Sequence, residues 1–122
     1  MPHIHISFTP NLPAQDNLET FALNLHHAIS PVVASGVENF KSYILPLNRI
    51  VFGSNDKEKA LLRIDIRMYA GRSDEVKQQV AEIIINEAKK LFTDASCTTP
   101  TEISVEVRDI EKENSHSALI ND

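Results

Sequence analysis

Hydrophobic and polar residues alternate along three segments of the chain, which is the pattern of a strand with one buried face. A fourth segment, interrupted by a proline, is also predicted to be a strand. The four segments are residues 3–8, 40–50, 62–68 and 103–110. In the first, Ile4, Ile6 and Phe8 share one face. Pro46 predicts an edge position or a bulge for the second, because proline cannot donate a hydrogen bond within a sheet.

Two longer segments show the period of an amphipathic helix. The first apolar stripe is Leu18, Phe21, Ala22, Leu25 and Ile29, and the second is Val76, Val80, Ile83, Ile84, Ala88 and Leu91. Asp16 and Glu19 predict a capping box at the start of the first helix, and Ser73 predicts a cap for the second. Pro31 predicts a break or kink in the first helix, with a shorter helical piece that ends near Gly36.

The order strand, helix, strand therefore occurs twice, and Ile4 aligns with Ile64 when the halves are superposed along the sequence. An internal duplication explains this agreement. Each half, about 2–50 and 62–110, requires a right-handed crossover that makes its two strands parallel. The predicted fold is one α/β domain over 1–122, with a four-stranded sheet, two main helices on one face and a polar C-terminal tail.

The other face of this sheet needs a cover of its own. Lys41 and Tyr43 lie two residues apart, so they share that face, which has mixed polarity. Association of several copies is the natural way to cover it. The sequence therefore predicts an oligomer.

Composition narrows the functional classes. The chain has 122 residues, a net charge of -5 and no basic run, which argues against sequence-independent binding of nucleic acid. Neither a secretory signal nor an apolar run of membrane-spanning length is present, so we expect a soluble, cytoplasmic protein that does not bind membranes. Cys97 is the only cysteine, which excludes an internal disulfide, and its polar surroundings indicate a surface thiol.

Two short motifs point to a family. Pro2 directly follows Met1 at the head of the first strand, and the motif GRSDE at 71–75 follows the third strand and opens the second helix. Each half keeps one of these signals. When the halves are aligned, the first half has Asn11 where the second half has the Gly-Arg pair. The second half has Leu62 where the first half has Pro2.

The chain resembles the tautomerase superfamily, whose short members begin with proline and enter their helix through GRS. The split between the halves resembles one branch, the 5-carboxymethyl-2-hydroxymuconate Δ-isomerase family, which has a fused double unit as its subunit. The resemblance covers roughly residues 2–110. It implies a homotrimeric enzyme of aromatic catabolism, in the degradation of homoprotocatechuate, without cofactor or metal. Its substrate would be a small anionic keto or enol acid.

The resemblance implies that Pro2 and Arg72 are catalytic. A proton shift in a 2-hydroxydienoate needs a base that removes a proton and returns it elsewhere. After removal of Met1, Pro2 would carry a free amine, whose pKa falls when it is buried or near a guanidinium. Arg72 could hold a carboxylate by two parallel hydrogen bonds. If Met1 is retained, the Pro2 nitrogen is an amide and cannot act as a base.

Several alternatives remain open at this point. In that family the second strand carries arginine near the positions that Lys41 and Tyr43 hold in this chain. As substrate-binding residues, these two side chains are compatible with a diacid and equally with a smaller keto–enol acid. Phenylpyruvate-type tautomerisation, hydration, dehalogenation and a non-catalytic trimeric binding module are the rival functions. Four of the five histidines, His3, His5, His26 and His27, suggest a weak metal-site hypothesis. Glu106 stands in the matching strand of the second half, which argues against a second active site there.

Overall fold

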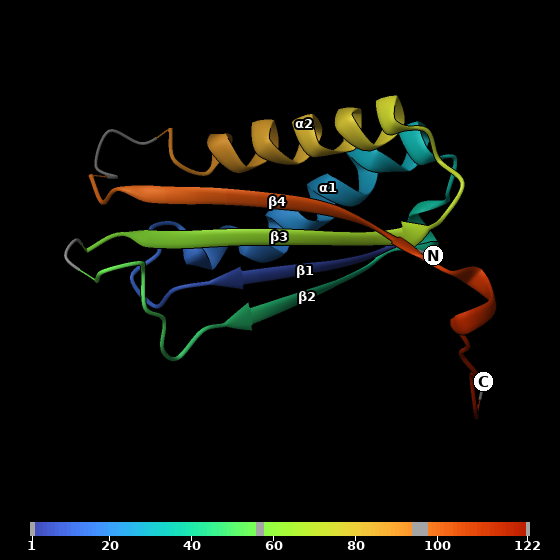
Figure 1. Ribbon diagram of the computed structural model, residues 1–122, viewed down its shortest axis with the longest axis horizontal. Helices are drawn as coiled ribbons and strands as arrows, with labels where there is room; N and C mark the ends of the chain where they lie inside the picture. The colour runs from blue at the N-terminus through green and yellow to red at the C-terminus, as the bar shows by residue number, and fades with distance from the viewer. Residues whose placement is uncertain (1, 56–57, 94–97, 122) are drawn as a thin grey trace.

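The computed structural model describes residues 2–55, 58–93 and 98–121, which leaves Cys97 outside the described residues. Its strands are β1 (His3–Phe8), β2 (Lys41–Pro46), β3 (Ala60–Tyr69) and β4 (Thr101–Ile110), and its helices are α1 (Leu18–Val33) and α2 (Asp74–Lys90). Three short 3-10 turns, Gln15–Asn17, Val37–Asn39 and Lys112–Asn114, complete the elements. Both long helices cover the same face of the sheet (Figure 1).

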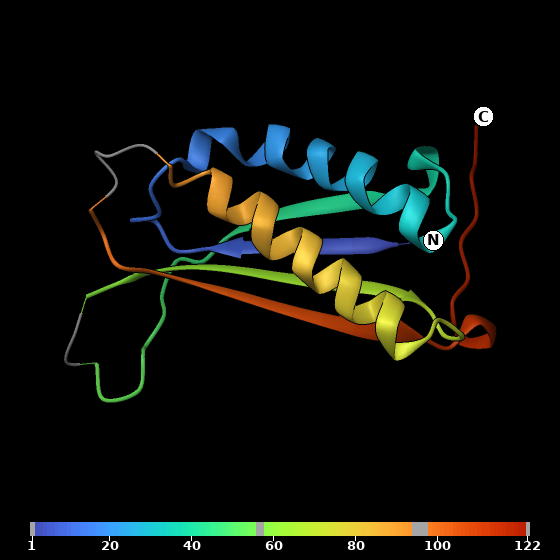
Figure 2. The ribbon, with the colours of Figure 1, turned by 90° about the horizontal axis from the view of Figure 1, so that it is seen from above.

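The sheet has the order β2-β1-β3-β4. β1 is parallel to β2 and β3 is parallel to β4, while the two halves meet through the antiparallel pair of β1 and β3. The predicted four-stranded α/β fold is confirmed, and Pro46 ends the edge strand β2 as expected. In the view from above, α1 and α2 cross the sheet side by side (Figure 2).

The core lies between the sheet and the helices. The alternating residues Ile4 and Ile6 of β1, and Ile64 and Ile66 of β3, are fully buried there. Leu25 of α1 is also fully buried, as are Val80, Ile84 and Ala88 of α2. The alternation that predicted the strands therefore defines the face that meets the helices.

Some local predictions about the first helix are wrong. No capping box forms, because a 3-10 turn takes up Asp16 and α1 begins at Leu18 without a side-chain cap. The helix also continues past Pro31 to Val33. Pro31 lies in the last turn, so the helix loses a single backbone hydrogen bond near its end instead of one in its interior. Ala34, rather than Gly36, takes the left-handed conformation that ends the helix, with φ 55°.

Of two other predicted boundaries, one differs in the structure and one is confirmed. β2 is shorter than the predicted strand at 40–50 and stops at Pro46, where the chain leaves the ladder. The cap of α2 is confirmed, because the Ser73 side chain accepts a hydrogen bond from the Val76 amide at 3.2 Å.

Among the described residues, neither α1 nor α2 has the length and hydrophobicity that a membrane-spanning helix requires.

Replacing Leu25 with alanine should lower the free energy of unfolding by about 2–5 kcal/mol, because the side chain is fully buried and its loss leaves a cavity. Denaturant titration measures this change. Leu23→Ala on the same helix is the matched control, since Leu23 is 57% exposed and should change stability by less than about 0.5 kcal/mol. Equal effects at the two positions would contradict the placement of α1.

Candidate active site

Pro2 lies at the end of the sheet where several elements meet. β1 and β2 begin there, β3 and β4 end there, and the C-terminus of α1 adjoins the N-terminus of α2 (Figure 1). Pro2 is buried, and its carbonyl accepts a hydrogen bond from the Lys41 amide at 3.1 Å. Pairing with β2 therefore fixes the backbone at Pro2 beside Lys41.

Arg72 lies at the same end of the sheet, just after β3. Its Nη1 donates to the Tyr69 carbonyl at 2.9 Å, and its Nη2 donates to the Val33 carbonyl at 3.0 Å. Val33 is the last residue of α1, where the backbone carbonyls carry partial negative charge. Arg72 thus ties the end of α1 to the end of β3, and neither of these hydrogen bonds goes to Pro2.

The guanidinium of Arg72 still has unused donors. An arginine side chain carries five N–H bonds, and these contacts use two of them. Its Nε is buried and has no hydrogen-bond partner. An unsatisfied buried donor costs free energy, so an anionic oxygen that accepted from it would be stabilised. Arg72 is therefore a cation held in place by two backbone carbonyls, with donor capacity left over.

Lys41 and Tyr43 lie on the sheet face turned away from the helices. In the register of β1 and β2, Lys41 pairs with His3 and Tyr43 pairs with His5. The Tyr43 hydroxyl is 3.0 Å from His3 Nδ1, and the Tyr43 ring stacks on His5 with centroids 4.7 Å apart. The predicted pair therefore shares a face, and Tyr43 is held by both histidines.

The electrostatics of this group favour neutral His3. Partial burial, followed by the positive charge of Lys41, lowers the pKa of His3 below its ordinary value. The folded protein thus holds His3 less protonated than the unfolded chain does. As pH falls below the ordinary histidine pKa, protonation of the unfolded chain removes some of the stability of the fold.

Lys41→Met should raise the pKa of His3 towards its ordinary value, because it removes a positive charge that disfavours imidazolium. Burial should still keep this pKa below the ordinary value. Titration of the imidazole protons by NMR measures the shift. Lys89→Met in α2 is the control and should leave His3 unchanged. A His3 pKa that does not move in Lys41→Met would contradict this electrostatic arrangement.

Arg67 is a cation that the sequence analysis did not single out. It pairs with His3 across the antiparallel ladder of β1 and β3, so it lies on the same face and at the same end as Lys41. The alternation in the third strand places Arg67 on the face opposite Ile64 and Ile66. This pattern could have identified Arg67 as a residue of the helix-free face. The positive charge near Pro2 is thus greater than predicted.

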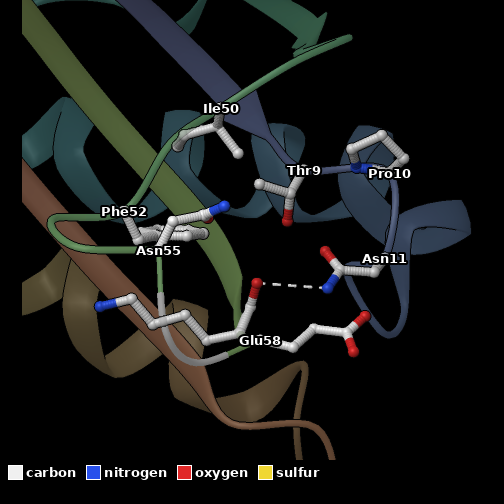
Figure 3. Close-up of a pocket in the computed structure, with 8 residues that line it drawn as sticks. Thr9, Pro10, Asn11, Ile50, Phe52, Asn55 and Glu58 are labelled. Carbon is white, nitrogen blue, oxygen red and sulfur yellow. Dashed lines mark hydrogen bonds between the residues drawn. The ribbon is translucent and has the colours of Figure 1, made fainter.

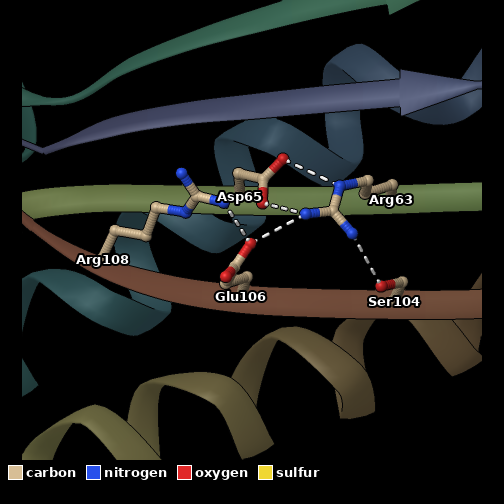
Figure 4. A network of polar contacts seen from close by, with 5 residues as sticks. All are labelled: Arg63, Asp65, Ser104, Glu106 and Arg108. Carbon is tan, nitrogen blue, oxygen red and sulfur yellow. Dashed lines mark hydrogen bonds and ion pairs between the residues drawn. The ribbon is translucent and has the colours of Figure 1, made fainter.

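Farther along the same face, the second half forms a network of ion pairs (Figure 4). Arg63 Nη2 lies 3.0 Å from Asp65 and 2.8 Å from Glu106, and Arg108 lies 2.8 Å from Glu106. The hydrogen bond from Arg108, with the nearby arginine charges, lowers the pKa of Glu106. Glu106 is therefore an ionised partner of arginines. It stands at the position that matches Tyr43 in the first half, because Tyr43 pairs with His5 and Glu106 pairs with Asp65.

The histidines do not converge. His3 and His5 lie on the helix-free face, whereas His26 Nε2 is 2.7 Å from the Ser42 hydroxyl beside α1. Burial lowers the pKa of His26 as well. Among the described residues, no group of three His, Cys, Asp or Glu could hold a metal ion.

Two of the cavities among the described residues lie at the opposite end of the sheet, past the end of β1. One, of about 430 Å³, is lined by Thr9, Asn11, Phe52 and Lys59 among others (Figure 3). Asn11 donates to the Lys59 carbonyl at 3.2 Å and bridges its two walls. An adjoining cavity of about 540 Å³ lies beside Val51 and Leu61. Neither cavity includes Pro2 or Arg72.

The family model of 5-carboxymethyl-2-hydroxymuconate isomerase matches residues 2–120. No curated protein matches the sequence. One similar solved structure is a 5-carboxymethyl-2-hydroxymuconate isomerase from Deinococcus radiodurans R1, with a TM-score of 0.79 and 18% identity, covering 96% of this chain and 88% of that chain. Another is a 5-carboxymethyl-2-hydroxymuconate delta-isomerase, with a TM-score of 0.78 and 18% identity, covering 99% of this chain and 89% of that chain.

A third similar structure is the symmetric trimer of a fused 4-OT, with a TM-score of 0.69 and 18% identity, covering 95% of this chain and 91% of that chain. At these identities the structural likeness shows the fold, which is tautomerase-like. The family match extends over nearly the whole chain and carries the activity class. The chain belongs to the 5-carboxymethyl-2-hydroxymuconate isomerase family, and it is an isomerase.

Proposed function

We propose that this isomerase moves a proton within a small anionic 2-hydroxydienoate, such as 5-carboxymethyl-2-hydroxymuconate. The observation that carries the proposal is that Pro2, just before β1, and Arg72, just after the antiparallel strand β3, lie at one end of the sheet, although they are 70 residues apart in the sequence. One can supply a base and the other a fixed cation. The family match supports the substrate class.

Pro2 would act as the general acid–base. Once Met1 is removed, its amine takes one proton from the substrate and returns it at another carbon, so the substrate neither gains nor loses atoms. An ordinary α-amine has a pKa of about 7.7–8.0. Pro2 is buried, and the cations Arg67 and Lys41 lie nearby, so the ammonium form is disfavoured. This would lower the pKa of the amine towards neutral pH, where general acid–base catalysis is most effective.

Arg72 would hold a substrate carboxylate. Its contacts to Tyr69 and Val33 keep the guanidinium in place before substrate arrives, so little ordering is needed on binding. The buried Nε and the remaining Nη hydrogens can donate to two carboxylate oxygens. The same positive charge would stabilise the enolate that forms during the proton shift.

Lys41 and Tyr43 would make auxiliary contacts to the substrate. Lys41 offers a point charge, and Tyr43 offers a hydroxyl that His3 already orients. Together with Arg67, they make this end of the helix-free face positive, which suits an anionic substrate in an acidic protein.

The working form would be a homotrimer. The helix-free face carries charged and aromatic side chains from all four strands, and copies of the chain could share it. The trimer of a fused 4-OT with a similar fold supports this assembly. A neighbouring copy would then lie beside Lys41 and Tyr43, which are exposed in the single chain.

Turnover of 5-carboxymethyl-2-hydroxymuconate, followed by absorbance, tests the proposal, with intact mass recorded on the same sample. Protein that lacks Met1 should convert the substrate in preference to phenylpyruvate, hydratable or halogenated acids. Light scattering should give the mass of a trimer. If the protein turned over one of the rival substrates and not 5-carboxymethyl-2-hydroxymuconate, the assignment of substrate would be overturned. Absence of turnover with every substrate tested would overturn it as well.

A further inference from the structure

Basic side chains form a row across the helix-free face of the sheet, at the end where Pro2 lies. Lys41 of β2 pairs with His3 of β1, His3 pairs with Arg67 of β3, and Arg67 pairs with Arg108 of β4. Residues that stand directly opposite one another in neighbouring strands lie on the same face of the sheet. The basic row, defined as Lys41, His3, Arg67 and Arg108, therefore places one basic side chain on every strand.

The arginines of this face differ in their partners. Arg108 lies 2.8 Å from Glu106, and Arg63 contacts both Asp65 and Glu106 (Figure 4). Arg67 stands between these groups in the ladder, and its side chain is exposed. Within the described part of the chain, Arg67 forms neither an ion pair nor a side-chain hydrogen bond. The acidic side chains nearest to it in the ladder are thus taken by the other two arginines.

Lys41 is also exposed and without an acidic partner among the residues that the structure describes. It pairs with β1 from the side opposite Arg67, so the backbones of the two cations are about 10 Å apart with His3 between them. Burial is the main cause that lowers the pKa of His3, and the charges of Lys41 and Arg67 contribute to it. Both charges therefore act on the same space above His3, and an anion placed there would reduce their repulsion.

Arg67 and Lys41 recognise an anion differently. A guanidinium is a planar fork that donates two parallel hydrogen bonds to one carboxylate, whereas an ammonium group is a point charge. Since no described residue occupies the N–H donors of Arg67, the whole fork is available. In the proposed function, Arg72 holds one substrate carboxylate. A muconate carries a carboxylate at each end of its carbon chain, so the second one still needs a partner.

We propose that Arg67 binds the second carboxylate of a dicarboxylate substrate and thereby makes the site prefer diacids to monoacids. The inference rests on the proposed function, which places the first carboxylate at Arg72. Lys41 adds positive charge to the second carboxylate, and Arg67 fixes its orientation. Lys41 and Tyr43 alone suit a diacid and a smaller keto–enol acid equally, and Arg67 favours the diacid.

Steady-state kinetics with two substrates tests the role of Arg67, on protein that lacks Met1. One substrate is 2-hydroxymuconate, and the other is the 2-hydroxydienoate in which a methyl group replaces the remote carboxylate. Arg67→Gln should raise KM for the diacid at least about tenfold and change kcat by less than about threefold, because the contact is equal in the ground state and the transition state. KM for the methyl analogue should stay within about twofold of the parent value.

Two further variants serve as comparisons. Arg67→Lys keeps the charge but not the fork, so it should recover only part of the preference for the diacid. Arg49→Gln makes the same chemical change at an exposed arginine past the far end of β2 and should behave as the parent does. All variants should keep the parent mass in light scattering. An unchanged KM for the diacid in Arg67→Gln, an equal loss with both substrates, or a smaller assembly would overturn the proposal.

Binding of inert acids separates this proposal from the proposed function. Sorbate differs from trans,trans-muconate only by a methyl group in place of one carboxylate, and neither acid has the hydroxyl group that ketonises. By calorimetry, the parent should bind muconate at least about tenfold more tightly than sorbate, and Arg67→Gln should remove this preference. If that result came without turnover of any hydroxydienoate, the proposed substrate would be wrong and the role of Arg67 would stand. Equal binding of the two acids by the parent, or a preference that survives Arg67→Gln, would refute that role.

Discussion

A form of the protein in which the Pro2 nitrogen is an amide should lose at least about 10²-fold in kcat, because general acid–base catalysis by a placed group contributes roughly that much or more. A cleavable extension ahead of Pro2 gives this form, and cleavage that leaves Pro2 first should restore turnover. The two samples differ only at the chain terminus. Comparison of their kcat values on 5-carboxymethyl-2-hydroxymuconate measures the contribution of the amine.

Pro2→Ala separates the amine from the proline ring. The variant keeps a terminal amine after removal of Met1 but loses the secondary amine and its rigid ring, so kcat should fall less than in the blocked form. The hydrogen bond to Lys41 uses the carbonyl of residue 2, so folding should be unaffected. Pro13→Ala, past the far end of β1, is the control and should keep its activity. Full turnover by the blocked form would refute the role of the amine.

The strand positions were predictable because they depend on local alternation. Ile4 and Ile6, and the matching Ile64 and Ile66, are buried by one physical cause, the two-residue period of a strand. The cap by Ser73 was predictable for a similar reason, since the side chain reaches an amide only three residues away. Each of these features is encoded within a few residues of the chain.

The features that the sequence did not predict depend on distant partners. α1 begins after a 3-10 turn instead of at a capping box, and it continues past Pro31 to Val33. Its end is contacted by Arg72, which donates to the Val33 carbonyl from 39 residues away. Arg67 was overlooked because its place beside His3 becomes clear only when β1 and β3 are paired.

The same contacts decide what Arg72 contributes. Nothing in the motif Gly-Arg-Ser distinguishes an arginine that binds substrate from one that braces a helix end. The structure gives Arg72 two backbone contacts and leaves its buried Nε without a partner, so the side chain can perform both tasks. A substitution should therefore affect folding and catalysis together, and the two effects must be measured separately.

Arg72→Ala should lower the free energy of unfolding by about 1–3 kcal/mol, because the carbonyls of Tyr69 and Val33 lose a charged donor. It should also lower kcat/KM by about 10²-fold or more, since two hydrogen bonds to a carboxylate contribute about 1.5–3 kcal/mol each. Denaturant titration and steady-state kinetics at a temperature where the variant is folded measure the two losses.

Arg72→Lys distinguishes the two roles, because it keeps the charge but not the two-pronged donor. Lysine should recover part of the stability through a single bond to one carbonyl, while kcat/KM stays low because the carboxylate loses its paired contact. Lys59→Ala is the control, since that cation pairs with Glu102 at the opposite end of the sheet and should leave kcat/KM within about twofold. If Arg72→Ala loses stability but keeps kcat/KM, then Arg72 braces α1 and binds no substrate, and Arg67 and Lys41 become the cations to test in its place.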